Sequence, residues 1–243
     1  MTITGVVALA LAIPLVVLLL LLGWPWFIGI VVAIVVAAVL VFPTTKQPAA
    51  NVLSAINGRP PNEMAHARLV NLVEGLSLST GVVEPEVIVL DDAARNAMTV
   101  ADPSGVTLVI TQGLVEALDR MQLEGVVAEL LVRAKDGDAE LGTEVASLVD
   151  RCSSGVLKPF SSFVVGRSTA LFDEDRDLLA DQAAVGVTRY PPALASAFAT
   201  LRSGSLQPSC ATPSNAHLWL VPHPTALVPS HPLDLRIDVL EEI

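Results

Sequence analysis

The stretch Asp119–Lys135, with the sequence DRMQLEGVVAELLVRAK, decides the fold of this chain. Its apolar residues recur at i, i+3, i+4, i+7, i+8 and i+11, which is the spacing of one buried stripe on a helix. They are Leu123, Val126, Val127, Leu130, Leu131 and Ala134. Glu129 and Arg133 border the stripe four residues apart, in the order acid then base that favours an ion pair. The sequence therefore predicts a core helix that carries its own ion pair.

The N-terminal region is too apolar for a purely soluble protein. Residues 3–42 contain no charged side chain, and about 20 apolar residues are enough to cross a bilayer once. The run is interrupted at residues 23–26 (GWPW), where glycine and proline favour a turn and tryptophan suits the membrane interface. The sequence predicts a transmembrane helical hairpin within residues 1–43, with spans near 3–22 and 27–42.

The charges that flank the hairpin predict how it is oriented in the cell membrane. A cleaved signal peptide fits residues 1–22 less well, because a basic n-region is absent and the apolar core is too long. Lys46 and Arg59, the nearest positive charges, both follow the second span, so we expect a cytoplasmic soluble domain. The lipid bilayer is thus one partner. The net charge of -11 argues against a nucleic-acid partner, which would require clustered Lys and Arg.

The rest of the chain predicts one mainly helical domain. Residues 44–61 are rich in Pro, Thr, Asn and Ser and read as a linker, so we expect the domain to span residues 62–243. Periodicity predicts further helices over 62–80, 140–152, 173–188 and 191–201 and strands over 86–91, 96–101 and 106–111. Turn residues at 102–105 join the last two strands as a hairpin. The expected fold class is α+β, with a small antiparallel sheet.

The segment Leu123–Asp138 resembles the active-site helix of membrane-bound zinc metallopeptidases of the HtpX and CAAX-prenyl endopeptidase type. In those proteins a similar apolar run surrounds His-Glu-x-x-His and is followed by Gly-Asp. Other segments match in the same order along the chain. The matching residues are Asn96, Ala97, Thr111, Gly113, Leu114, Leu123, Glu124, Val126, Val127, Ala128, Leu131, Lys135, Gly137, Asp138, Ala180, Asp181, His231, Pro232, Arg236 and Ile237. The resemblance implies a zincin-like domain and a zinc cofactor.

The catalytic letters of that family are replaced. By the resemblance, Glu129 and Arg133 stand where the two histidine ligands would be, and Leu130 stands where the general-base glutamate would be. Asp177 takes the position of the third ligand, and Asp181 matches an aspartate that supports a histidine. Arginine has no lone pair to donate and leucine cannot accept a proton. We therefore expect no zinc, no other cofactor and no catalytic residue.

Arg133 suggests what replaces the metal. We expect its guanidinium to lie between Glu129 and either Asp177 or Asp181, where it would tie two helices together. The alternative is an exposed Glu129–Arg133 pair, which contributes little to stability.

The sequence offers two further candidate binding sites, each with an alternative interpretation. The resemblance implies that the strand with Asn96, Ala97 and Met98 lies beside the cleft and pairs with a peptide backbone; alternatively it is only an edge strand. His217, His223, His231 and Cys210 lie in one segment and offer another metal cluster, although such histidines more often cap or pack. Cys152 and Cys210 are expected to be free thiols.

Three functions agree with this sequence. The first is a membrane-anchored, inactive homologue of HtpX-like metallopeptidases, which acts as a binding or regulatory protein with a protein or peptide partner. The second is an active zinc metalloendopeptidase with atypical ligands. The third is a structural membrane subunit that interacts through its hairpin.

Overall fold

The computed structural model describes residues 48–153, 158, 161–224 and 226–243, together with scattered positions between 17 and 35. The expected hairpin at 1–43 lies almost entirely outside these residues. Within the described part of the chain, no helix is both long and apolar enough to cross a bilayer.

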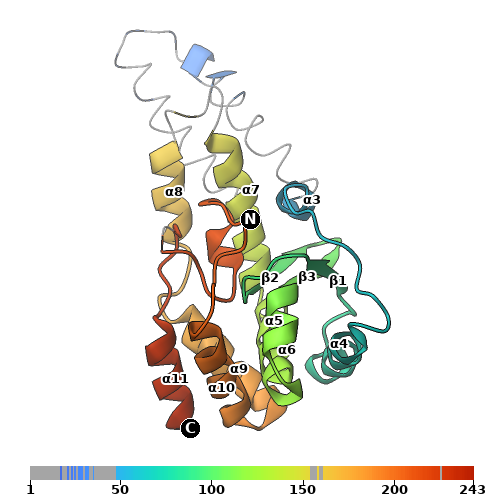
Figure 1. Ribbon diagram of the computed structural model, residues 1–243. Helices are drawn as coiled ribbons and strands as arrows, with labels where there is room; N and C mark the ends of the chain where they lie inside the picture. Colours follow the sequence, from blue (N-terminus) through green and yellow to red (C-terminus); the bar gives the residue numbers. More distant parts are fainter. Residues whose placement is uncertain are drawn as a thin grey trace.

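The domain contains three strands packed among helices (Figure 1). The strands are β1 Glu86–Leu90, β2 Ala97–Asp102 and β3 Gly105–Thr111. The described helices are α3 Pro48–Leu53, α4 Ala67–Thr80, α5 Gln112–Ala117, α6 Arg120–Lys135, α7 Asp138–Cys152, α8 Ser161–Thr169, α9 Arg176–Thr188, α10 Pro191–Arg202 and α11 Leu233–Glu241. A short 3-10 helix, η2, spans Ala216–Leu218.

Helix α6 lies at the centre of the domain, as its apolar stripe predicts. It begins with a capping box, in which the Asp119 carboxylate accepts from the Gln122 N–H at 2.9 Å and the Gln122 side chain accepts from the Asp119 N–H at 3.0 Å. Five residues of the stripe are fully buried: Leu123, Val126, Val127, Leu130 and Leu131. In Figure 1, α9, α10 and α11 lie on one side of α6, and the sheet with α4 lies on the other. The core helix is confirmed.

The sheet is mixed, and the expectation of an antiparallel sheet was wrong for one of its two pairs. The strand order is β1-β3-β2. The β2–β3 hairpin is antiparallel as expected, but β1 pairs with β3 in parallel. The reason is the connection 91–96, which passes across the carboxyl end of β3. It therefore leaves β1 on the opposite side of β3 from β2.

Close backbone contact at Gly113 makes this crossing possible. The Gly113 N–H donates to the carbonyl of Asp92 at 2.9 Å. A Cβ atom at Gly113 would lie 2.2 Å from the carbonyl oxygen of Ala93, so no other residue fits without moving the backbone. The start of α5 is thereby held against the loop before β2.

Part of the stretch expected as a linker is folded. Helix α3 packs on α7 and β2, and its residues Ala49 and Val52, with Ile56 just beyond, join an apolar cluster that includes Met98 and Trp219. The sequence signal was weak because a six-residue helix has too few turns to display periodicity. The folded part of the chain therefore includes residues from Pro48 onward.

Candidate functional site

A network of buried charges occupies the position that the resemblance assigns to zinc. Helix α6 supplies Glu129 and Arg133, and α9 supplies Asp177. Arg133 Nη2 lies 2.8 Å from Glu129 Oε1 and 3.2 Å from Asp177 Oδ1, and Arg133 Nε donates to the same glutamate oxygen at 3.0 Å. Glu129 and Asp177 are 0% exposed and Arg133 is 3% exposed. The predicted bridge between helices is confirmed, and the alternative of an exposed pair was wrong.

Asp181 pairs with Arg236 of α11 and not with Arg133. Arg236 donates to both oxygens of Asp181, at 2.6 and 2.7 Å, and to Glu129 Oε1 at 2.8 Å. Its guanidinium also donates to the Leu220 carbonyl at 2.9 Å and lies 4.2 Å from the Phe198 ring centroid. In the sequence, Arg236 stands out only as part of an Arg-Ile pair that matches the resemblance. Periodicity could not assign it a partner, because Asp181 lies 55 residues away.

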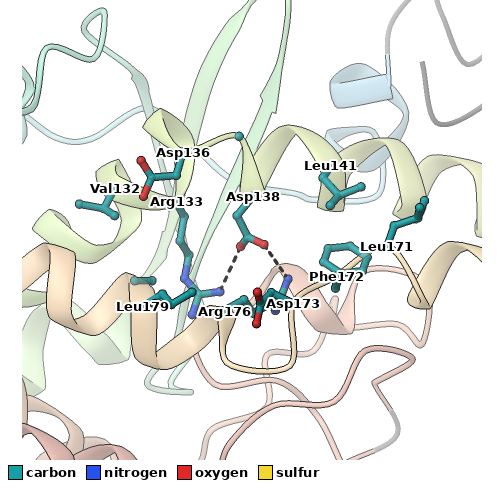
Figure 2. Close-up of a pocket in the computed structure, with 12 residues that line it drawn as sticks. Val132, Arg133, Asp136, Asp138, Leu141, Leu171, Phe172, Asp173, Arg176 and Leu179 are labelled. Atoms are coloured by element: carbon teal, nitrogen blue, oxygen red, sulfur yellow. Dashed lines mark hydrogen bonds and ion pairs between the residues drawn. The ribbon is translucent and has the colours of Figure 1, made fainter. Parts of the chain in front are cut away.

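Arg176 and Asp138 extend the network toward the surface. Arg176 Nη1 lies 3.2 Å from Asp138 Oδ1, and Arg176 Nη2 donates to the His217 carbonyl at 2.6 Å. Figure 2 shows Asp138 between the guanidinium groups of Arg133 and Arg176. The distance from Arg133 Nη1 to Asp138 Oδ2 is 3.9 Å, so this contact is an ion pair without a hydrogen bond.

The pKa values of the two aspartates of α9 are shifted in opposite directions. Burial alone would raise the pKa of Asp177, but the charges of Arg133, Arg236 and Arg176 outweigh it and hold this pKa at about 2. Burial raises the pKa of Asp181 to about 7, against the attraction of Arg236 and with the help of the nearby Glu129. Burial also acts to lower the pKa of Arg133, but Glu129 and Asp177 raise it further above its ordinary range.

The charges of this network are balanced except for one carboxylate. The network contains the three guanidinium groups described above and four carboxyl groups, on Glu129, Asp138, Asp177 and Asp181. One proton makes the whole network neutral, and an unbalanced charge is costly away from water. The raised pKa of Asp181 agrees in direction with the uptake of one proton.

The residues present do not fit zinc. Zinc takes lone pairs from thiolate, imidazole or carboxylate, whereas a guanidinium fills the space between the Glu129 and Asp177 oxygens. Its fixed positive charge would repel a cation. Leu130 is 0% exposed and packs in the apolar stripe, so no general base stands there.

The histidines and cysteines that the sequence offered as a second metal cluster have separate structural environments. His217 is fully buried, its Nε2 lies 3.0 Å from the Gly142 carbonyl, and burial lowers its pKa to about 4. The His231 backbone N–H donates to Asp177 Oδ2 at 3.2 Å. Cys152 and Cys210 are free thiols. Among the described residues, no group of three or more His, Cys, Asp or Glu side chains is arranged to hold a metal ion.

The strand expected to bind a peptide is already paired with the chain's own C-terminal part. Leu220 N–H donates to the Ala97 carbonyl at 2.7 Å, and Met98 forms an antiparallel bridge with Trp219. The Asn96 side chain donates to the carbonyls of Leu206 and Val221 and accepts from the Val221 N–H. Asn96, Ala97 and Met98 are all 0% exposed. A peptide would have to displace this buried segment before it could pair with β2.

Comparison with known proteins places the chain near one group of proteases. The Protease HtpX homolog of Tropheryma whipplei (strain Twist) is 35% identical over an alignment of 181 positions, which covers 63% of this chain and 62% of that protein. The Protease HtpX homolog of Dictyoglomus thermophilum is 28% identical over 79% of this chain and 73% of its own length. For the homolog of Ligilactobacillus salivarius the identity is 27%, over 88% of this chain and 86% of that protein.

These matches do not cover whole proteins. The matched region spans 62% of the length of the two Tropheryma whipplei relatives. No family model matches the chain, and no solved structure matches it.

Proposed function

Since the chain is a distant homologue of the Protease HtpX homologs, we propose that it is a non-hydrolytic relative of those proteases. In this proposal it is attached to the membrane by its apolar N-terminal region and acts as a binding or regulatory protein. The observation that carries the proposal is the Arg133 guanidinium, which lies within 3.2 Å of both Glu129 and Asp177.

The replacements at Leu130 and Arg133 support the loss of hydrolysis. A working site of the type that the resemblance implies needs metal ligands and a base that activates water. Arg133 supplies a cation where a ligand is needed, and the buried Leu130 supplies no base. The guanidinium balances the carboxylates of α6 and α9 as a metal ion would, so the fold can persist without the metal.

Membrane attachment rests on the sequence. Residues 3–42 carry no charge and are long enough for two spans. Such an anchor would keep the folded domain close to membrane-embedded partners and raise their effective concentration.

The binding role requires a surface other than the edge of β2. That edge is paired with Trp219 and Leu220, and Trp219 is only 1% exposed. Opening it would expose core residues. We therefore expect a partner to bind at a surface other than this edge.

The test is a paired measurement of metal content and proteolysis on the full-length chain in detergent. We expect less than one zinc per ten chains by mass spectrometry, and no cleavage of β-casein with or without chelator. The matched control is the quadruple variant E129H/L130E/R133H/D177E, which supplies two imidazoles, a carboxylate and a base. Zinc bound by this variant would demonstrate that the assay detects a site of this kind.

The opposite result is equally clear. Chelator-sensitive cleavage by the unaltered chain, abolished when Arg133 or Asp177 is replaced, would overturn the proposal in favour of an active metallopeptidase with atypical ligands. A parallel purification from cells that do not express this chain shows whether contaminating proteases cause the cleavage.

A further inference from the structure

A pocket of about 300 Å³ lies beside the charge network, away from the paired edge of β2. It is formed where α6 ends, α7 begins and α9 begins. Half of its twelve lining residues are apolar: Val132, Leu141, Leu171, Phe172, Leu179 and Ala180. Two of them are unusually accessible, since Leu171 is 41% exposed and Leu179 is 53% exposed. Figure 2 shows Leu171 and Phe172 on one side of the buried charges and Leu179 on the other.

The accessible charges of this pocket are acidic. Asp136 and Asp173 are exposed and Asp138 is partly exposed, and all three line the pocket. The two basic residues that line it, Arg133 and Arg176, are buried and already paired with carboxylates. A ligand that approaches from solvent therefore meets apolar surface bordered by negative charge.

Two guanidinium donors of the lining residues Arg133 and Arg176 are unused. Arg133 Nη1 and Arg176 Nε are buried and have no hydrogen-bond acceptor among the described residues. Arg133 Nη1 lies 3.9 Å from an Asp138 oxygen and Arg176 Nε lies 3.7 Å from an Asp177 oxygen, both beyond hydrogen-bond distance. Buried donors without acceptors cost free energy. After a small side-chain movement, a backbone carbonyl of a ligand could accept from them.

From these features we propose that the pocket is the docking site for a partner segment that is both basic and apolar. An apolar side chain of the segment packs between Leu171 and Leu179, and flanking Lys or Arg side chains pair with Asp136 and Asp173. This inference rests on the proposed binding role and not on the loss of hydrolysis. It names the surface and the chemistry of the partner.

Other ligand classes agree less well with the same pocket. A small anion would meet the carboxylates of Asp136, Asp138 and Asp173 before it reached a guanidinium. A simple metal cation would gain nothing from Leu171, Leu179 and Phe172, and it would face two buried arginines. A basic and apolar peptide uses both kinds of surface.

The test is fluorescence anisotropy with a labelled hexapeptide of alternating arginine and leucine, titrated with the full-length chain in neutral detergent. Empty micelles serve as the blank. The measurement is made at about 0.15 M salt, where screening suppresses distant charges. We expect saturable binding that is weakened about tenfold by Leu179→Asp and about threefold to tenfold by the pair Asp136→Asn and Asp173→Asn.

Matched controls separate docking from general attraction to an acidic protein. Leu78→Asp changes another leucine, 87% exposed on α4, and should leave the affinity unchanged. Glu84→Gln with Glu86→Gln removes two exposed acids elsewhere and should also have no effect. Absence of binding, or equal weakening by the control pair and the pocket pair, would overturn the docking site.

The outcome is distinguishable from failure of the proposed function. If the peptide binds and is also cleaved in a chelator-sensitive way, the docking site stands and the non-hydrolytic role falls. If the peptide neither binds nor is cleaved, the docking site falls and the non-hydrolytic role is unaffected.

Discussion

Arg133 illustrates how strongly burial changes the contribution of one side chain. Its guanidinium contacts Glu129 and Asp177 out of reach of water. Loss of this guanidinium would leave the buried network with one more uncompensated negative charge. The same residue type at the surface behaves differently, because water and salt screen the pair.

For Arg133→Met we expect the free energy of unfolding to fall by roughly 3 to 5 kcal/mol, since one partner of a buried ion pair is removed. Arg202→Ala is the control, because Arg202 pairs with Asp234 at the surface with side chains 57% and 67% exposed. Its expected cost is below about 1 kcal/mol. Urea unfolding followed by circular dichroism measures both values. Equal costs for the two variants would contradict the structural role of Arg133.

Asp181 gives the network a pH dependence. Its pKa in the folded chain, about 7, lies above its ordinary value of 3.8. Between these two values the folded chain binds the proton more tightly than the unfolded chain does. This residue therefore makes stability decrease as pH rises from about 4 to 7. Asp177 acts in the opposite sense, because its pKa of about 2 makes stability fall as pH drops below 3.8.

His217 changes stability over the same pH range as Asp181, but in the opposite direction. Its folded pKa of about 4 lies below its ordinary 6.5, so its contribution makes stability increase with pH there. We therefore expect Asp181→Asn to show a steeper rise of stability from pH 4.5 to 6.5 than the unaltered chain, by up to about 1.4 kcal/mol per pH unit. Chemical unfolding at several pH values tests this. Parallel pH profiles for the two proteins would show that Asp181 does not hold the proton.

At the scale of elements, the sheet depends on one loop crossing. Residues 91–96 turn across the end of β3, and Gly113 permits the contact because it has no side chain. This crossing sets the parallel pairing of β1 and positions Asn96 at the start of β2. Asn96 then fixes the C-terminal segment through Leu206 and Val221.

Gly113→Ala should therefore destabilise the domain by at least about 2 kcal/mol, because its Cβ would lie 2.2 Å from a backbone oxygen. The control is Gly75→Ala, which adds a Cβ in open space on an exposed position of α4. It should stabilise by roughly 0.5 to 1 kcal/mol, since alanine favours the helix. Thermal unfolding compares the two variants. A neutral Gly113→Ala would mean that the crossing is looser than the structure indicates.

At the scale of the whole molecule, two apolar clusters share β2 and β3. The larger cluster is centred on α6, and the smaller one joins α3 to Met98 and Trp219. Since successive strand residues point to opposite faces, one strand can contribute to both clusters. The N-terminal part of the folded chain is thereby coupled to the segment that covers β2.

We expect Ile56→Ala to lower the unfolding free energy by about 2 kcal/mol or more, as for other buried residues cut to alanine. Met64→Ala, at a side chain 91% exposed, should change it by less than about 0.5 kcal/mol. Circular dichroism should record a single transition for both variants. A separate early transition in Ile56→Ala would show that α3 folds independently of the rest.

The sequence by itself determined the local features of this protein. The stripe in Asp119–Lys135 predicted α6, and the turn at 102–105 predicted the β2–β3 hairpin. By the resemblance, Glu129 and Arg133 stand at two ligand positions and Leu130 at the position of the general base, and these letters can be read directly from the sequence. Periodicity, turn preference and the lack of a lone pair on arginine are properties of neighbouring or single residues.

Only the tertiary structure decided which distant groups meet. Arg236 joins Glu129 across 107 residues and Asp181 across 55, and Trp219 covers the strand that was expected to be open. The parallel pairing of β1 has the same origin. These contacts depend on where packed elements carry their side chains in space, because burial brings opposite charges and unpaired backbone groups together whatever their separation along the chain.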